Sequence, residues 1–174
     1  MRDTAAKQWF FKGYAPFKYD RPISGIILQL KYGGRGDVAR FLGASMANAW
    51  GVTPPAPPRL GVLVPVPLHK KRLRRRGYNQ ALLLAREVSK ITGLPVDEVL
   101  IRTRKTTAQK KMDTAERAEN TKNAFAVRDK AAIEGLEFII VDDVFTSGST
   151  VNECARILTQ NGAKKVEILV AARA

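Results

Sequence analysis

Hydrophobic residues follow two spacings along the chain, and each spacing predicts a different element. Continuous apolar or β-branched runs are typical of strands buried on both faces. They lie at 60–68, 96–101, 125–127, 136–141 and 165–172. Apolar residues three or four positions apart are typical of amphipathic helices. They lie within 20–30, 37–49, 79–92 and 150–160. Because strands and helices alternate after residue 60, the sequence predicts an α/β fold with a mostly parallel, doubly wound sheet flanked by helices.

Local signals add detail near the N-terminus. Residues 1–19 are rich in aromatic side chains but lack a clear period, which predicts an extended arm or a hairpin. Asp20 is expected to cap the first helix and Asp37 the second, because Asp is a favoured N-cap residue. In the second helix, Phe41 and Ala49 are expected on the inward face.

Proline and glycine suggest how the chain is organised. Four prolines within 53–58 make a stiff connector that fits neither a helix nor a central strand. We expect one domain, 1–174, with an N-terminal helical arm and hood portion (1–58) and an α/β core (59–174). Residues 102–121 are polar, basic and rich in hydroxyl groups, which is typical of a mobile functional loop.

Length and cysteine usage exclude several classes of protein. A chain of 174 residues is long enough for one domain with a proper core. Its single cysteine, Cys154, excludes an intrachain disulfide and favours a reducing cytoplasm. We expect Cys154 to be a packed helix residue. No apolar run approaches the ~18–20 residues of a membrane span, and the N-terminus lacks the order of a signal peptide, so we expect no membrane insertion.

The positive charge is large and unevenly spread. The formal net charge is +14, and residues 61–111 hold 13 Lys or Arg against 3 Asp or Glu. Concentrated positive charge favours a polyanionic partner, such as nucleic acid or a phosphate-rich substrate, although a solvated basic face is the simpler alternative.

The strongest candidate chemistry follows the apolar run that starts at Phe138. That run ends in Asp142 and Asp143, and a short hydroxyl-rich loop then leads directly into a predicted helix. Polar groups at the carboxyl end of such a strand lie where open α/β sheets bind ligands. The two carboxylates could accept hydrogen bonds from sugar hydroxyls or hold Mg²⁺. The loop would offer hydroxyls and backbone N–H groups to a phosphate at a helix N-terminus. Its members are Thr146, Ser147, Gly148, Ser149 and Thr150.

A second candidate follows the apolar run at 60–68, where six Lys or Arg occur within residues 69–76. Arginine offers a bidentate fork that suits phosphate oxygens, so the end of this run is the expected pyrophosphate-binding loop. Its members are Val66, Pro67, Leu68, His69 and Lys70. His69 is either a phosphate or acid–base contact or, as we favour, a polar turn residue. Lys31 and Arg35, on a glycine-rich turn, either touch phosphate or lie in an ordinary turn.

Residues 138–150 resemble the phosphoribosyl pyrophosphate (PRPP) signature of the type I phosphoribosyltransferases. Nearly the whole chain resembles the ComF family of competence-associated, phosphoribosyltransferase-like proteins. The matching segments are Lys31-Tyr-Gly-Gly-Arg35, Val64-Pro-Val-Pro-Leu-His69, Arg75-Arg-Gly-Tyr-Asn-Gln80, Arg102 to Asn120, and Val141 to Thr150. Many members carry a four-cysteine zinc module ahead of the first segment, and this chain does not.

The resemblance implies a type I phosphoribosyltransferase fold, PRPP as substrate with Mg²⁺, and a flap at 102–121 whose Gln109 and Arg117 face the pyrophosphate or the acceptor. Asp142 and Asp143 would be the catalytic and metal-binding residues. Single-stranded DNA and DNA-uptake proteins are further expected partners, and a homodimer is left open.

Two functions are therefore open. One is a phosphoribosyltransferase with an unknown acceptor; the other is a competence protein that binds single-stranded nucleic acid and whose PRPP site is regulatory or vestigial. The two do not exclude each other, and we favour both. For the second, the candidate contacts are Arg74, Arg75, Arg76 and Tyr78, because aromatic groups among basic residues suit single strands. Burial of Tyr78 is the favoured alternative.

Overall fold

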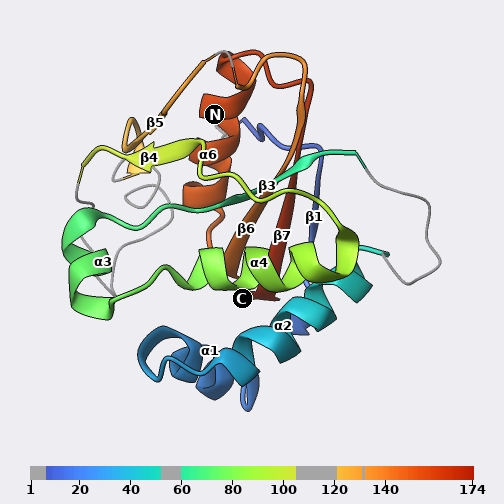
Figure 1. The fold of residues 1–174 in the computed structure, drawn as a ribbon, viewed down its shortest axis with the longest axis vertical. Coiled ribbons are helices and arrows are strands. Elements are labelled where there is room, and N and C mark those ends of the chain that lie inside the picture. Colours follow the sequence, from blue (N-terminus) through green and yellow to red (C-terminus); the bar gives the residue numbers. More distant parts are fainter. Residues whose placement is uncertain (1–6, 52–59, 105–120, 131) are drawn as a thin grey trace, which may run out of the picture.

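The computed structural model describes residues 7–51, 60–104, 121–130 and 132–174. Its centre is a five-stranded parallel sheet in the order β1-β7-β6-β3, with β2 also paired to β7 (Figure 1). The strands are β1 (Lys12–Tyr14), β2 (Phe17–Lys18), β3 (Val62–Pro65), β6 (Glu137–Phe145) and β7 (Lys165–Arg173). The α/β fold predicted from the sequence, a mostly parallel sheet flanked by helices, is confirmed.

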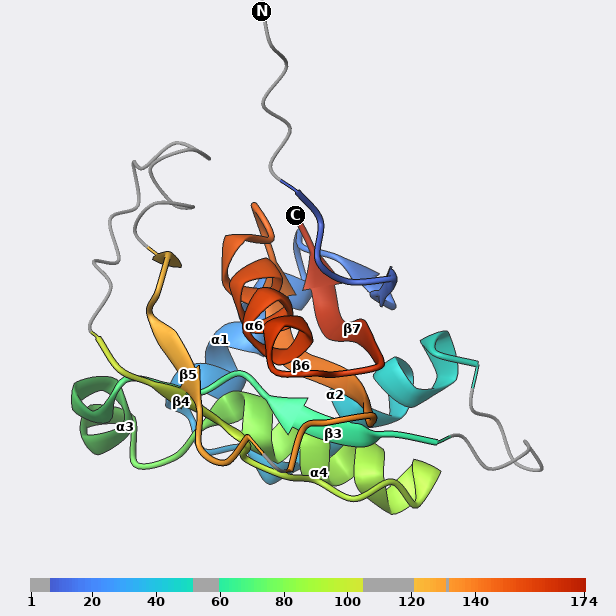
Figure 2. The same ribbon diagram turned by 90° about the horizontal axis from the view of Figure 1, so that it is seen from above.

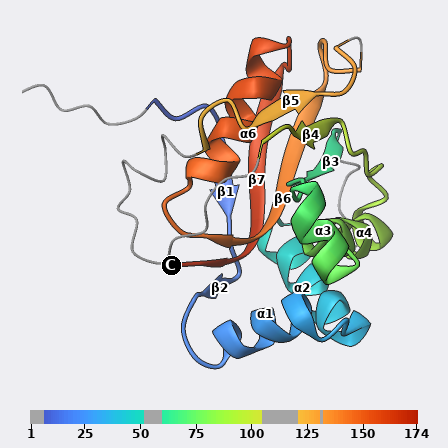
Figure 3. The ribbon, with the colours of Figure 1, turned by 90° about the vertical axis from the view of Figure 1, so that its left-hand side faces the viewer.

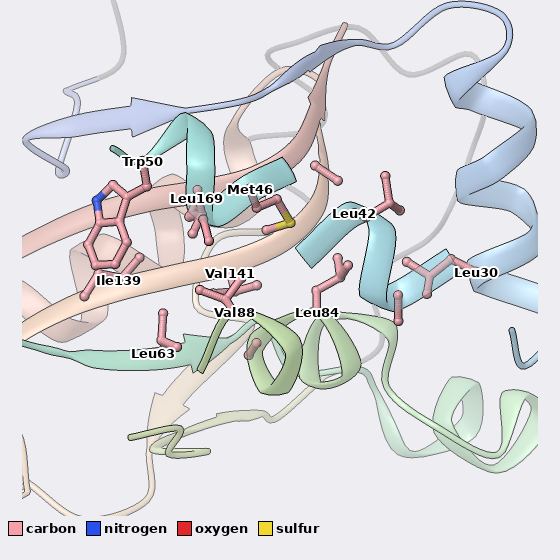
Figure 4. Packing of buried hydrophobic residues seen from close by; sticks show 14 of the residues in the cluster. Leu30, Leu42, Met46, Trp50, Leu63, Leu84, Val88, Ile139, Val141 and Leu169 are labelled. Carbon is pink, nitrogen blue, oxygen red and sulfur yellow. The ribbon is translucent and has the colours of Figure 1, made fainter. Parts of the chain in front are cut away.

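The flanking helices cover both faces of the sheet. They are α1 (Ile23–Tyr32), α2 (Gly36–Ala49), α3 (Lys70–Arg76), α4 (Gln80–Thr92) and α6 (Ser149–Gln160). Figure 2 shows α6 on one side of the sheet and α2 with α4 on the other. Alternate residues of β6 serve the two sides: Ile139 and Val141 join the α2–α4 cluster drawn in Figure 4, whereas Phe138 and Ile140 join the α6 cluster. None of the described helices is long and apolar enough to cross a membrane.

The N-terminal helices form where the hydrophobic spacing predicts them, but both expected caps are wrong. Pro22 occupies the N-cap position of α1, so Asp20 lies two residues ahead of it, where its backbone carbonyl accepts from the Ser24 N–H at 2.8 Å. Asp37 lies inside the first turn of α2, where its carboxylate bonds the Arg35 side chain at 2.9 and 2.6 Å. Phe41, expected inward, is exposed and stacks on the ring of Phe17.

Ala49 is also exposed, because the inward face of α2 runs through residues at positions 38, 39, 42, 46 and 47. The Trp50 side chain is buried at the end of this helix, and its Nε1 donates to Glu167 at 3.0 Å. The proline connector expected at 53–58 lies outside the described residues.

The N-terminal arm is extended, as predicted, and is not a hairpin. β1 and β2 both run parallel to β7, with Lys12 opposite Glu167 and Phe17 opposite Ala172. Figure 3 shows the arm at the edge of the sheet, followed by α1. The arm therefore extends the sheet beyond β7.

The runs at 96–101 and 125–127, predicted as strands, lie mostly outside the main sheet. Val96 makes one parallel bridge to Leu63. The strands β4 (Leu100–Arg102) and β5 (Phe125–Val127) then pair antiparallel as a separate sheet. Leu100 and Phe125 are buried in the α6 cluster, so this small sheet packs against α6.

The helix α3 was not predicted, because six of its seven residues are Lys or Arg and give no apolar period. Lys and Arg are nevertheless good helix formers. The His69 side chain caps its start by accepting from the Lys71 N–H at 3.2 Å, and Gly77, at a φ of 84°, ends it.

We expect Gly43→Ala to destabilise the protein, although alanine normally favours a helix interior over glycine by about 1 kcal/mol. A Cβ at Gly43 would lie 2.5 Å from Cβ of Glu87, so α2 and α4 would have to separate. Overpacking of this kind costs about 1–3 kcal/mol. Gly25→Ala in α1 is the matched control, because its Cβ would meet nothing within 4 Å. Denaturant unfolding should show a loss for the first variant and a gain for the second; a gain in both would contradict the close approach.

Candidate active site

The two adjacent carboxylates lie within β6 instead of after its end, because β6 continues to Phe145 through its pairing with β7. On the other side, the pairing of β6 with β3 stops at Val141, opposite Pro65. Asp142 and Asp143 are thus the first residues of β6 beyond its pairing with β3. This is the kind of crevice at which open α/β sheets bind ligands.

Asp143 is buried and held by side chains from two helices. Its Oδ2 forms an ion pair with Lys31 Nζ at the end of α1, and its Oδ1 accepts from Gln80 Nε2 at 3.0 Å. The Arg76 guanidinium in turn donates to the Gln80 side-chain oxygen and lies 5.3 Å from the centre of the Tyr32 ring. A chain of contacts therefore runs from the basic helix α3 through α4 to the carboxylate.

The surroundings move the pKa values of the two carboxyls in opposite directions. Burial raises the pKa of Asp142, and the adjacent charge of Asp143 raises it further. Burial also disfavours the charged form of Asp143, but the Lys31 ammonium and the hydrogen bonds outweigh it, so the pKa of Asp143 is lowered. Asp143 is thus the carboxyl that keeps its charge, and Asp142 is the one that more readily holds a proton.

The predicted phosphate loop joins β6 to α6 as a tight turn. Gly148 has a φ of 73°, and a Cβ there would lie 2.5 Å from the Phe145 ring, so only glycine fits. The hydroxyls of Ser147 and Ser149 lie 2.8 Å apart and share a hydrogen bond. A small pocket at the N-terminus of α6 is lined by the whole loop together with Asp142. The structure therefore brings together Asp142, Thr146, Ser147, Gly148, Ser149 and Thr150.

The expected pyrophosphate loop follows β3 at the same end of the sheet. The Val66 backbone is already engaged: its N–H donates to the Val141 carbonyl at 2.9 Å, and its carbonyl accepts from Asn79 Nδ2 at 3.1 Å. Pro67, Leu68 and His69 are half-buried and Lys70 is exposed. The His69 Nδ1 caps α3, which fits the polar turn that we favoured for it.

The expected nucleic-acid residues divide into exposed and engaged side chains. Arg74 and Arg75 are exposed on α3. Tyr78 donates its hydroxyl to the Leu30 carbonyl at 2.7 Å and accepts from the Gly34 N–H at 3.0 Å. Tyr78 is half-buried, and it therefore ties α1 and its glycine turn to the start of α4.

Most of the expected flap, including Gln109 and Arg117, lies outside the described residues. Its flanking residues are side by side: the Thr103 N–H donates to the Ala124 carbonyl at 2.9 Å, and Arg104 donates to the Lys122 carbonyl at 2.6 Å. Arg102, at the end of β4, is half-buried, and its pKa is lowered by burial and by the charge of Arg72.

Comparison with known proteins agrees with this geometry. Residues 77–174, more than half of the chain, match the phosphoribosyl transferase domain. The chain belongs to this family.

Three relatives confirm the resemblance to the ComF family. The DNA utilization protein YhgH of Escherichia coli (strain K12) is 38% identical over 156 residues, which cover 86% of this chain and 66% of the relative. Competence protein F of Haemophilus influenzae is 36% identical over 118 residues, covering 64% of this chain and 50% of the relative. Competence protein ComFC of Bacillus subtilis is 29% identical over 150 residues, which cover 84% of this chain and 57% of the relative. The chain thus spans two thirds or less of the length of these relatives.

Solved structures show the same fold at low sequence identity. The allosteric regulatory enzyme of purine biosynthesis superposes with a TM-score of 0.52 at 19% identity, over 82% of this chain and 29% of the other. Glutamine PRPP amidotransferase from B. subtilis, solved with ADP and GMP, superposes with a TM-score of 0.51 at 19% identity. The superposition covers 81% of this chain and 30% of the other.

Sequence reasoning missed the two partners of Asp143. Lys31 was considered only as a phosphate contact or a turn residue. Gln80 carried a usable signal, since it lies four and eight residues before the buried Leu84 and Val88 and so shares their inward helix face. A polar side chain on a buried face needs a polar partner. The partner's identity required the fold.

We expect Lys31→Met to lower the free energy of unfolding by about 3 kcal/mol at pH 7, which is the lower end of the range for breaking a buried ion pair. This loss corresponds to a fall of roughly 6–12 °C in Tm. In the parent, Lys31 lowers the pKa of Asp143, so the pair stabilises above the unfolded pKa of about 3.9 and loses this effect as pH falls through the folded pKa. The Tm difference between the proteins should therefore persist from pH 7 down to about pH 4 and shrink as the pH falls further. Lys90→Met, which breaks the exposed pair with Glu87, is the control and should cost less than about 1 kcal/mol. If Lys31→Met and the parent had equal Tm values at pH 7, Lys31 would not stabilise the protein by pairing with Asp143.

Proposed function

We propose that this chain is a phosphoribosyltransferase of the ComF type that binds Mg²⁺·PRPP and transfers the phosphoribosyl group to an acceptor. The observation that carries the proposal is the pocket formed by Asp142 and the loop 146–150 at the N-terminus of α6. It combines donors suited to a phosphate with an acceptor suited to a sugar hydroxyl. Family membership and the shared fold support the same assignment.

The parts of PRPP are assigned by charge and position. The 5′-phosphate lies in the loop, where hydroxyls and the helix N-terminus favour an anion. The ribose hydroxyls lie beside Asp142. The pyrophosphate lies toward 66–70, where Lys70 adds positive charge.

The carboxylates fit Mg²⁺ only in part. Mg²⁺ commonly binds one or two carboxylates together with substrate phosphates and water. Asp142 is half-buried and lines the loop pocket, so its oxygens suit this role. Asp143 is already engaged by Lys31 and Gln80, so it would act mainly by setting the charge around Asp142. When bound, the ion would help to neutralise the departing pyrophosphate.

The reaction is a displacement at the anomeric carbon. The bond to pyrophosphate breaks with its electron pair leaving on the pyrophosphate oxygen, a bond to the acceptor forms, and the acceptor loses a proton. Positive charge develops on the ribose ring as the bond breaks. The chain's own contribution is to orient the ribose through Asp142 and to hold the two phosphate groups apart.

A second function, binding of single-stranded nucleic acid in DNA uptake, has its own support. All seven residues of α3 are exposed or half-buried, and six are basic. The relatives carry the names DNA utilization protein and competence protein. The two functions are compatible, because the PRPP pocket uses none of the exposed α3 arginines.

The first test is PRPP binding by thermal shift and calorimetry. Mg²⁺ with PRPP at ~100 times its dissociation constant should add ~2.7 kcal/mol, or roughly 5–10 °C in Tm. Asp142→Asn and the double variant Asp142→Asn/Asp143→Asn should lose most of the shift. Asp97→Asn, at an exposed residue that does not line the pocket, should keep it. If the parent protein shows neither a Tm shift nor a heat of binding with Mg²⁺ and PRPP, the proposal is refuted.

The loop makes a separate prediction. Gly148→Ala should weaken PRPP binding at least about tenfold, because the new Cβ would displace Phe145 and strain a left-handed turn. Gly93→Ala has the same φ of 73° but open space around its Cβ, so it controls for backbone strain alone. Calorimetry should show normal PRPP affinity for the Gly93 variant. If Gly148→Ala and Gly93→Ala bound PRPP with equal affinity, the 5′-phosphate would not lie in the loop 146–150.

A further inference from the structure

The N-terminal arm carries an unusual arrangement of aromatic and basic side chains. Residues 7–19 contain six aromatic residues and three lysines, with no acidic residue. Phe11 is 71% exposed, so much of its ring is accessible to a ligand. Three lysines lie over arm rings: Lys7 over Trp9 at 4.0 Å, Lys165 over Phe11 at 4.8 Å and Lys12 over Tyr14 at 4.9 Å.

The arm is held in place by the body of the protein. Asn152, in the first turns of α6, accepts from the Trp9 N–H at 2.8 Å and donates to the Lys7 carbonyl at 3.0 Å. The Phe11 N–H donates to the Val166 carbonyl at 2.8 Å, and β1 then pairs with β7. The aromatic faces are therefore positioned in advance, which lowers the entropic cost of binding a ligand.

A cavity of about 610 Å³ lies between the arm and the sheet. This volume falls in the range of small-molecule sites. No acidic side chain is among the described residues that line it. Aromatic rings and two cations contribute to its walls: Phe10, Tyr14, Phe17, Phe145, Lys18 and Arg173. The chemistry suits a flat ring joined to a negative charge, which is the chemistry of a nucleotide unit.

We propose that the arm is a binding surface for single-stranded nucleic acid, with one base in the cavity, further bases stacked on Phe11 and Trp9, and phosphates near Lys7, Lys12 and Lys18. A strand explains more than a free nucleotide does, because the alternation of rings and cations continues outside the cavity. A duplex fits poorly, because its bases are not free to stack on side chains. The arm carries several rings of this kind, whereas beside α3 the Tyr78 hydroxyl is engaged with α1 and the exposed ring is that of Tyr32, under Arg76.

This inference deepens the second proposed function by locating its base-stacking surface, and it is independent of PRPP. The arm and α3 lie toward opposite edges of the main sheet, since β1 is at one end of the strand order and β3, which precedes α3, is at the other. Variants of the two surfaces can therefore be compared separately.

The test is binding of a fluorescently labelled 20-nucleotide oligothymidine, followed by anisotropy over a range of salt concentrations. Phe11→Ala should weaken binding at least about fivefold, the lower end for loss of one stacked base. Lys12→Gln/Lys18→Gln should make the slope of log K against log salt shallower by about 1.4, or about 0.7 for each phosphate that is no longer neutralised. Arg86→Gln/Lys90→Gln on α4 is the charge-matched control, and Leu28→Ala, also exposed, is the apolar control; both should bind like the parent.

Photo-crosslinking gives a readout that does not depend on a variant folding. With bromodeoxyuridine in the oligonucleotide, crosslinks in the parent protein should map to 9–19. Competition by duplex DNA or thymidine monophosphate should be weak. The arm proposal would be overturned if the crosslinks lay on α3, the Phe11 and lysine variants bound fully, and Arg74→Gln/Arg75→Gln lost binding. Binding of single-stranded nucleic acid would then still stand as the second function. Absence of any oligonucleotide binding would overturn both. Thymidine monophosphate that competes as well as the oligonucleotide would mean a mononucleotide site and would overturn the proposal of a strand.

Discussion

The carboxylate of Asp143 lies in the interior of the protein, where an isolated charge would cost several kcal/mol. Lys31 from α1 and Gln80 from α4 meet this requirement, one with a charge and one with a hydrogen bond. Neither partner is near Asp143 in sequence, so the three elements must come together for any of them to be satisfied. Tyr78 reinforces the arrangement by bonding the end of α1 to the start of α4. The N-terminal helices are thereby tied to the centre of the sheet.

The need of Asp143 for buried partners also gives Asp142 and Asp143 different roles. Asp143 is committed to its protein partners and stays ionised, whereas Asp142 lines the pocket beside the loop. A pair that looks equivalent in the sequence thus consists of one residue that fixes the local charge and one that can meet a ligand. The sheet makes the division, because successive residues of a strand point to opposite faces.

The surface divides in a similar way. The basic helix α3 has the exposed ring of Tyr32 beside it, under Arg76, whereas the arm presents several rings with lysines over them. Phosphate attraction alone needs only charge. Stacking of bases needs exposed π faces held in place, which Asn152 and the pairing with β7 provide for the arm. The Phe145 ring lines both the arm cavity and the loop pocket, so the two regions share a wall.

The sequence by itself determined the elements whose signals are local. The buried runs of β6 and β7 follow from apolar continuity, and the turn at Gly148 follows from a glycine among hydroxyl residues between a strand and a helix. The same local rules failed for α3, whose six basic residues carry no apolar period, and for the caps expected at Asp20 and Asp37. Tertiary structure alone decided which strands pair, that the runs near 100 and 126 form a separate sheet, and that Lys31 and Gln80 hold Asp143. The reason is physical: a helix or turn depends on neighbours in sequence, whereas the partner of a buried charge depends on which distant segments the fold brings within a few ångströms of it.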